Sequence, residues 1–83
     1  MQGVFIHDGS DFRRPKSKRE ITSLIASGGL VVLEDTSIFG NEYGGPVDRM
    51  PEGTTAYFVG PDPYTRRTFY GSLKRVGYQI IIR

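Results

Sequence analysis

Residues 17–33, SKREITSLIASGGLVVL, constrain the fold of this 83-residue chain more than any other stretch. Ser17 followed three residues later by Glu20 is a capping box, in which each side chain satisfies a backbone N–H at a helix start. Gly28 and Gly29 end the helix, because glycine adopts the left-handed conformation without a Cβ penalty. The apolar run LVVL that follows is typical of a strand covered on both faces. The stretch therefore predicts a helix packed on a mostly parallel sheet.

The rest of the chain completes the order strand, helix, strand, strand, helix, strand. We expect strands at 4–6, 30–33, 54–59 and 78–82, and helices at 18–27 and 64–76, with Gly77 ending the second helix. The glycine- and proline-rich segment 34–53 is expected to be a long loop or insertion. Its length suits a crossover between parallel strands, since an antiparallel hairpin needs only a few residues.

The expected fold is therefore α/β, a single domain over residues 1–83 with a four-stranded parallel sheet flanked by helices. A ferredoxin-like domain shares the same element order and is the alternative architecture. In that alternative the second and third strands pair as an antiparallel hairpin.

Composition excludes several kinds of site. The chain has no cysteine and a single histidine, His7, so disulfides, thiolate metal sites and histidine-rich metal clusters are excluded. No apolar run approaches the roughly 20 residues of a membrane span. His7 lies near Asp8 and Asp11, a possible acid–base pair, but we interpret it as the end of a strand followed by turn residues. We expect no metal, no cofactor, no small-molecule substrate and no membrane partner.

The elements in this order resemble a BRCT domain. The segments that carry the resemblance are the apolar strand 4–6, LIASGG and LVVL at 24–33, TTAYFVG at 54–60, and YQIII at 78–82. The basic run that starts at Pro15 is similar to the first BRCT repeat of an end-joining DNA ligase. The family's third helix and its tryptophan are missing here, and the loop 34–53 is longer than in compact members.

The resemblance implies a protein–protein interaction domain of a nuclear DNA-repair protein, acting in DNA double-strand-break end joining. The implied partner is a coiled-coil repair scaffold or a phosphoprotein. The domain itself is expected to be non-catalytic, even as part of an ATP-dependent DNA ligase.

Phosphopeptide-binding members of the family use a serine or threonine with a backbone N–H after the first strand, and a lysine near the second helix. The resemblance places Gly9 and Ser10 in the first role and Arg66, Arg67 or Lys74 in the second. Such groups give charge-assisted hydrogen bonds to phosphate. The alternative interpretation makes Ser10 a turn residue and leaves the basic side chains in solvent.

A small nucleic-acid-binding module, with weak DNA contact, is the alternative from another functional class. Basic residues cluster at 13–19 and 66–75, and four tyrosines, at 57, 64, 70 and 78, could stack on bases. The acidic residues between 34 and 52 interrupt a continuous basic surface. A steep loss of binding with added salt distinguishes nucleic-acid contact from protein contact.

Overall fold

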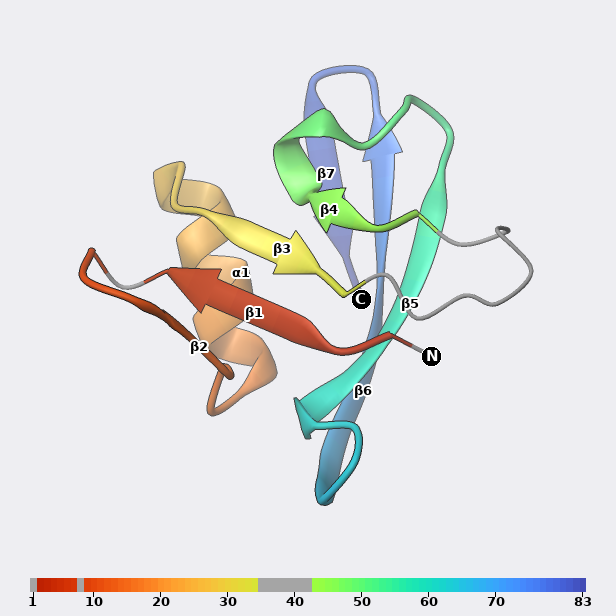
Figure 1. Cartoon of the computed structure of the whole chain (residues 1–83). Helices are drawn as coiled ribbons and strands as arrows, with labels where there is room; N and C mark the ends of the chain where they lie inside the picture. The colour runs from red at the N-terminus through yellow and green to blue at the C-terminus, as the bar shows by residue number, and fades with distance from the viewer. Residues whose placement is uncertain (1, 8, 35–42) are drawn as a thin grey trace.

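The structure, a computed structural model, describes residues 2–7, 9–34 and 43–83, which form two antiparallel sheets and one α-helix (Figure 1). The first sheet has the order β2-β1-β3-β4 and consists of β1 (Val4–His7), β2 (Phe12–Arg13), β3 (Val31–Leu33) and β4 (Gly45–Pro46). The second has the order β5-β6-β7 and consists of β5 (Thr55–Asp62), β6 (Arg66–Val76) and β7 (Gln79–Ile82). The helix α1 spans Lys18–Ser27, and a 3₁₀ turn, η1, spans Val47–Arg49.

Gln2 connects the two sheets just before β1 begins. It forms a parallel bridge with Phe58 in the middle of β5. The Gln2 N–H donates to the Tyr57 carbonyl, and the Gln2 carbonyl accepts from the Val59 N–H, both at 2.9 Å. The β5 edge of the second sheet is therefore paired with the chain entering the first sheet.

The predicted parallel four-stranded sheet flanked by helices, which the BRCT resemblance also implied, is wrong. Within the two described sheets, every pair of strands is antiparallel. The segment 64–76, predicted as a second helix, is mostly strand β6, so the ferredoxin-like alternative is wrong there as well. Gly77 has the predicted left-handed conformation, with φ of +61°, but in the β6–β7 turn.

The misassigned helix has a physical explanation. Phe69 and Leu73 are four residues apart, a spacing that places side chains on one face of a helix and also on one face of a strand. In β6 the two side chains pack on the core, whereas Tyr70 and Lys74 are exposed. Val76, the third member of the predicted helical stripe, is exposed too. The true period of this segment is therefore two.

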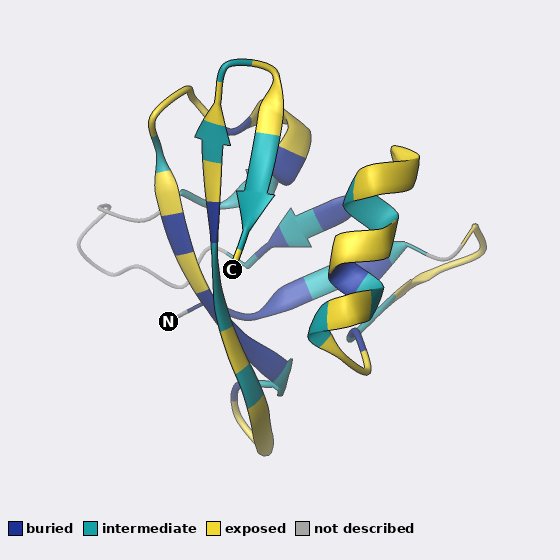
Figure 2. Cartoon of the chain, turned by 180° about the vertical axis from the view of Figure 1, so that it is seen from behind, coloured by how far each residue is buried: buried dark blue, intermediate teal, exposed yellow. Residues whose placement is uncertain are grey.

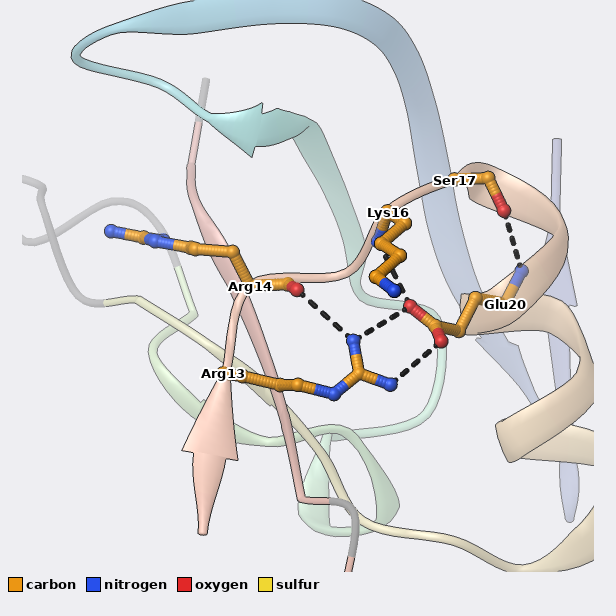
Figure 3. A network of polar contacts seen from close by, with 5 residues as sticks. All are labelled: Arg13, Arg14, Lys16, Ser17 and Glu20. Atoms are coloured by element: carbon orange, nitrogen blue, oxygen red, sulfur yellow. Dashed lines mark hydrogen bonds and ion pairs between the residues drawn. The ribbon is translucent and has the colours of Figure 1, made fainter.

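The helix α1 has the predicted bounds because local interactions fix both of its ends. The Ser17 hydroxyl accepts the Glu20 N–H at 3.2 Å, and Gly28 caps the C-terminus with φ of +79°. The Glu20 carboxylate, however, accepts from the Lys16 N–H and from the Arg13 guanidinium, as Figure 3 shows. Glu20 therefore binds the segment that precedes the helix, in addition to its place in the first turn.

Part of the predicted long loop forms secondary structure. Residues 35–42 lie outside the described residues, and the remainder of 34–53 contains β4 and η1. Met50 and Val47 from this region are buried in the core.

The core lies between the two sheets and beneath α1. Exposed and buried residues alternate over the first four residues of β5, from Thr55 to Phe58, and appear as alternating bands in Figure 2. The buried apolar residues of this cluster are Val4, Ile6, Ile21, Val31, Leu33, Val47, Met50, Ala56, Phe58 and Leu73. The opposite face of the β5-β6-β7 sheet is turned away from this core.

Phe58→Ala is expected to lower the free energy of unfolding by about 3–5 kcal/mol, because it removes buried contacts and leaves a cavity. Tyr57→Ala, the next position on β5, is expected to change it by about 1 kcal/mol or less, because Tyr57 lies on the exposed face. Urea unfolding followed by circular dichroism measures both. Equal losses would contradict the assignment of two faces to β5.

Glu20→Gln is expected to destabilise the protein at pH 7 by about 1 kcal/mol or less and to have a smaller effect near pH 3. Hydrogen bonds from Arg13 and from the Lys16 backbone lower the pKa of the Glu20 carboxyl below its ordinary 4.5. The stabilisation is therefore present above that ordinary pKa and is lost as the pH falls through the lowered native pKa. Urea unfolding at pH 7 and near pH 3 measures this difference, with Glu52→Gln as a control. An equal loss of stability by Glu20→Gln at the two pH values would contradict the lowered pKa.

Candidate functional site

A groove of about 660 Å³ opens between the C-terminal end of α1 and the β6–β7 hairpin. Ile25 and Leu30 line it on the side of α1 and β3. Val47 and Asp48 from η1 line it as well, and Ile80 lines it on the side of β7. The groove therefore lies beside the first half of β7, where Gln79 and Ile80 line it.

Among the residues that the structure describes, no strand pairs with β7 along the edge that faces away from β6. Ser72 and Arg83 exchange both backbone hydrogen bonds, at 2.9 and 3.0 Å. In an antiparallel pair such hydrogen-bonded positions alternate, so Ile81 also directs its N–H and C=O toward β6. The N–H and C=O groups of Ile80 and Ile82 point the other way, and β7 is the last strand in its sheet. We call this side of β7, with these four backbone groups, the β7 edge.

Strand β7 is short, with four residues, but it lacks the proline and charged residues that often prevent strand addition. Its sequence, Gln-Ile-Ile-Ile, contains no proline, lysine or other charged residue. The Ile80 and Ile82 side chains pack against the core and hold the strand in place. An extended chain lying in the groove would find an ordered row of donors and acceptors.

Arg75 fixes one wall of the groove. Its Nε donates to the Gly77 carbonyl at 3.0 Å, and one terminal nitrogen donates to the carbonyls of Asp48 and Met50 at 2.8 and 3.1 Å. These bonds tie the β6–β7 hairpin to η1. Arg75 is therefore a structural cation, and much of its hydrogen-bonding capacity is already used.

Besides the hydrogen-bonded Arg75, the groove offers two negative features to a cationic ligand group, the C-terminus of α1 and Asp48. The last turn of α1 contains no basic residue, so the partial negative charge of its C-terminus is not compensated from within the helix. Asp48 lies on the same groove and is exposed. Tyr78, which is 100% exposed, stands in the adjoining turn with its ring available to cover a ligand.

The structure places the predicted phosphate-binding residues in separate regions. Gly9 and Ser10 lie in the β1–β2 turn, and Arg66 and Arg67 begin β6 at the β5–β6 hairpin, a different end of the molecule in Figure 1. Lys74 is seven residues beyond Arg67 on the same strand, roughly 23 Å away at about 3.3 Å per residue. The chain does not bring Lys74 to the two arginines, and phosphate recognition stays a prediction.

A second polar cluster joins the end of β3 to the β5–β6 hairpin. The Glu34 carboxylate accepts from the Arg14 guanidinium at 2.7 Å and from the Tyr64 hydroxyl at 2.8 Å. The Arg14 guanidinium also lies 3.9 Å from the centre of the Phe5 ring. The hydrogen bond to Glu34 raises the pKa of the Tyr64 phenol. We interpret this cluster as a structural connection.

Neither metal nor membrane contact gains support from the described part of the chain. It contains no group of three or more His, Asp or Glu residues that could hold a metal ion. Its helix is not long and apolar enough to cross a membrane. No protein-family model, curated protein or solved structure matches the chain. The site is therefore interpreted from its own geometry.

Glu34→Gln is expected to lower the pKa of Tyr64 toward its ordinary value of 10, because the neutral amide removes the charged acceptor that holds the phenol proton. A pH titration followed by NMR of ring-labelled tyrosine measures the change. Tyr70 serves as the internal control. An unchanged Tyr64 titration in the variant would contradict the hydrogen bond.

Proposed function

We propose that this protein is a non-catalytic interaction module that binds an extended segment of a partner protein along the β7 edge. The observation that carries the proposal is the outward direction of the Ile80 and Ile82 backbone groups, together with the groove that Ile80 lines. Addition of a strand to an exposed sheet edge is a common mode of peptide recognition, in which backbone hydrogen bonds supply affinity. The groove then selects the side chains.

The groove defines the sequence pattern of the segment. Successive side chains of an extended chain point to opposite sides, so every second residue would face the groove. Leu30, Val47 and Ile80 favour apolar residues at those positions. Asp48 and the C-terminus of α1 favour one lysine or arginine among them. The partner segment is therefore apolar at alternate positions and carries a basic residue.

The proposal keeps the expectation of protein–protein interaction without catalysis and assigns the contact to residues that the sequence did not single out. The nuclear location, the role in end joining, and the coiled-coil or phosphoprotein partner stay predictions of the BRCT resemblance. The ligase setting stays a prediction too.

Synthetic seven-residue peptides with alternate valines and a single lysine, placed at each position in turn, are suitable probes. We expect at least one of them to bind and to shift the amide NMR signals of Ile80 and Ile82 most. Two N-methylated versions of the peptide are compared, one methylated at the odd-numbered peptide bonds and one at the even-numbered bonds. We expect one version to lose binding and the other to keep it, because only every second N–H group faces the β7 edge. Equal binding by the two versions would contradict strand addition.

Asp48→Asn provides the test of charge in the same assay. The variant is expected to weaken the lysine peptide several-fold and to leave an alanine-substituted peptide unchanged. Asp62→Asn is the matched control, because it removes one carboxylate at the far end of β5 and its amide oxygen can still accept the Tyr64 N–H. Equal weakening by both variants would assign the effect to net charge instead of the groove.

A further inference from the structure

The outer face of the β5-β6-β7 sheet, opposite the core, brings together aromatic and basic side chains. Tyr57 pairs with Ser72, which pairs with Arg83, so these three residues form one row across the sheet. Thr55, Lys74 and Ile81 form the next row. Because directly opposite residues share a face, both rows project to the same side. We call this surface, together with Tyr70, the outer face.

Two tyrosines on the outer face are neighbours. Tyr70 pairs with Val59, which shares its face and is buried. Tyr70 therefore lies diagonal to Tyr57, and such positions are roughly 7–8 Å apart. Tyr57 is 59% exposed and Tyr70 is 53% exposed. The small side chain of Ser72 stands beside them and leaves both rings accessible.

The charge of this sheet is mainly positive, and Lys74 and Arg83 carry it on the outer face. Residues 55–83 contain five basic residues and one acidic residue, a net charge of +4, although the whole chain carries only +2. The single acid, Asp62, lies at the end of β5 beyond the bulge at Gly60/Pro61, where its carboxylate accepts the Tyr64 N–H. Lys74 and Arg83 are exposed, and no acidic side chain belongs to the outer face.

We propose that the outer face binds single-stranded nucleic acid, with bases stacked on Tyr57 and Tyr70 and phosphates contacted by Lys74 and Arg83. Aromatic platforms flanked by cations bind single strands with little sequence preference, because every base has a π-face. A sheet surface presents side chains to unstacked bases, which a duplex does not offer. The proposal uses a different surface from the β7 edge and does not depend on peptide binding.

The experiment measures fluorescence anisotropy of a labelled oligothymidine about 15 nucleotides long, titrated with the whole chain at several salt concentrations. We expect binding that weakens steeply with salt. Tyr57→Ala and Tyr70→Ala are each expected to weaken binding about tenfold, whereas Tyr57→Phe keeps the ring and the affinity. Lys74→Ala is expected to reduce the slope of log K against log salt by about 0.7.

Matched controls separate stacking from other effects. Phe12→Ala removes a half-exposed aromatic ring from β2, and Arg19→Ala removes an exposed cation from α1. Neither is expected to change affinity, and circular dichroism verifies the fold of every variant. Absence of binding at low salt would overturn the proposal. Binding that survives both tyrosine-to-alanine changes would overturn it as well, since only unspecific charge attraction would remain.

Discussion

The two backbone hydrogen bonds between Gln2 and β5 are the interaction on which the rest of the structure depends. Among the described residues, they are the backbone hydrogen bonds that join the two sheets. The Gln2 side chain is buried, and its amide nitrogen donates to the carbonyls of Glu34 and Tyr43. Gly3 follows in a space where a Cβ would approach the Arg14 guanidinium to 2.5 Å. This crowded junction sets the relative position of the first and second sheets.

The same junction makes the second sheet asymmetric. Its β5 edge is paired with Gln2, whereas its β7 edge is free and lies beside the groove at the end of α1. One face packs on the core, and on the other face Tyr57, Tyr70, Lys74 and Arg83 are exposed, whereas Val59 is buried. The two proposed binding surfaces are therefore the edge of the second sheet that is not paired with Gln2 and the face of that sheet that does not pack on the core.

The sequence predicted those elements whose signals are local. The helix Lys18–Ser27 was predicted with both of its ends because Ser17 and Gly28 act on neighbouring backbone groups. Strand β6 was mistaken for a helix because Phe69 and Leu73 fit both periods. Strand direction was also wrong, since it depends on distant pairings such as that of Gln2. The β7 edge could not be predicted, because an apolar run such as residues 80–82 does not reveal whether its strand is central or at an edge.

Amide hydrogen exchange along β7 tests the central claim most directly. In the free protein we expect a protected Ile81 amide between fast-exchanging amides of Ile80 and Ile82, because of these three amides Ile81 alone donates toward β6. Addition of a binding peptide should then slow exchange at Ile80 and Ile82. Strong protection of Ile80 and Ile82 in the free, monomeric protein would contradict the free edge, and with it the proposed function.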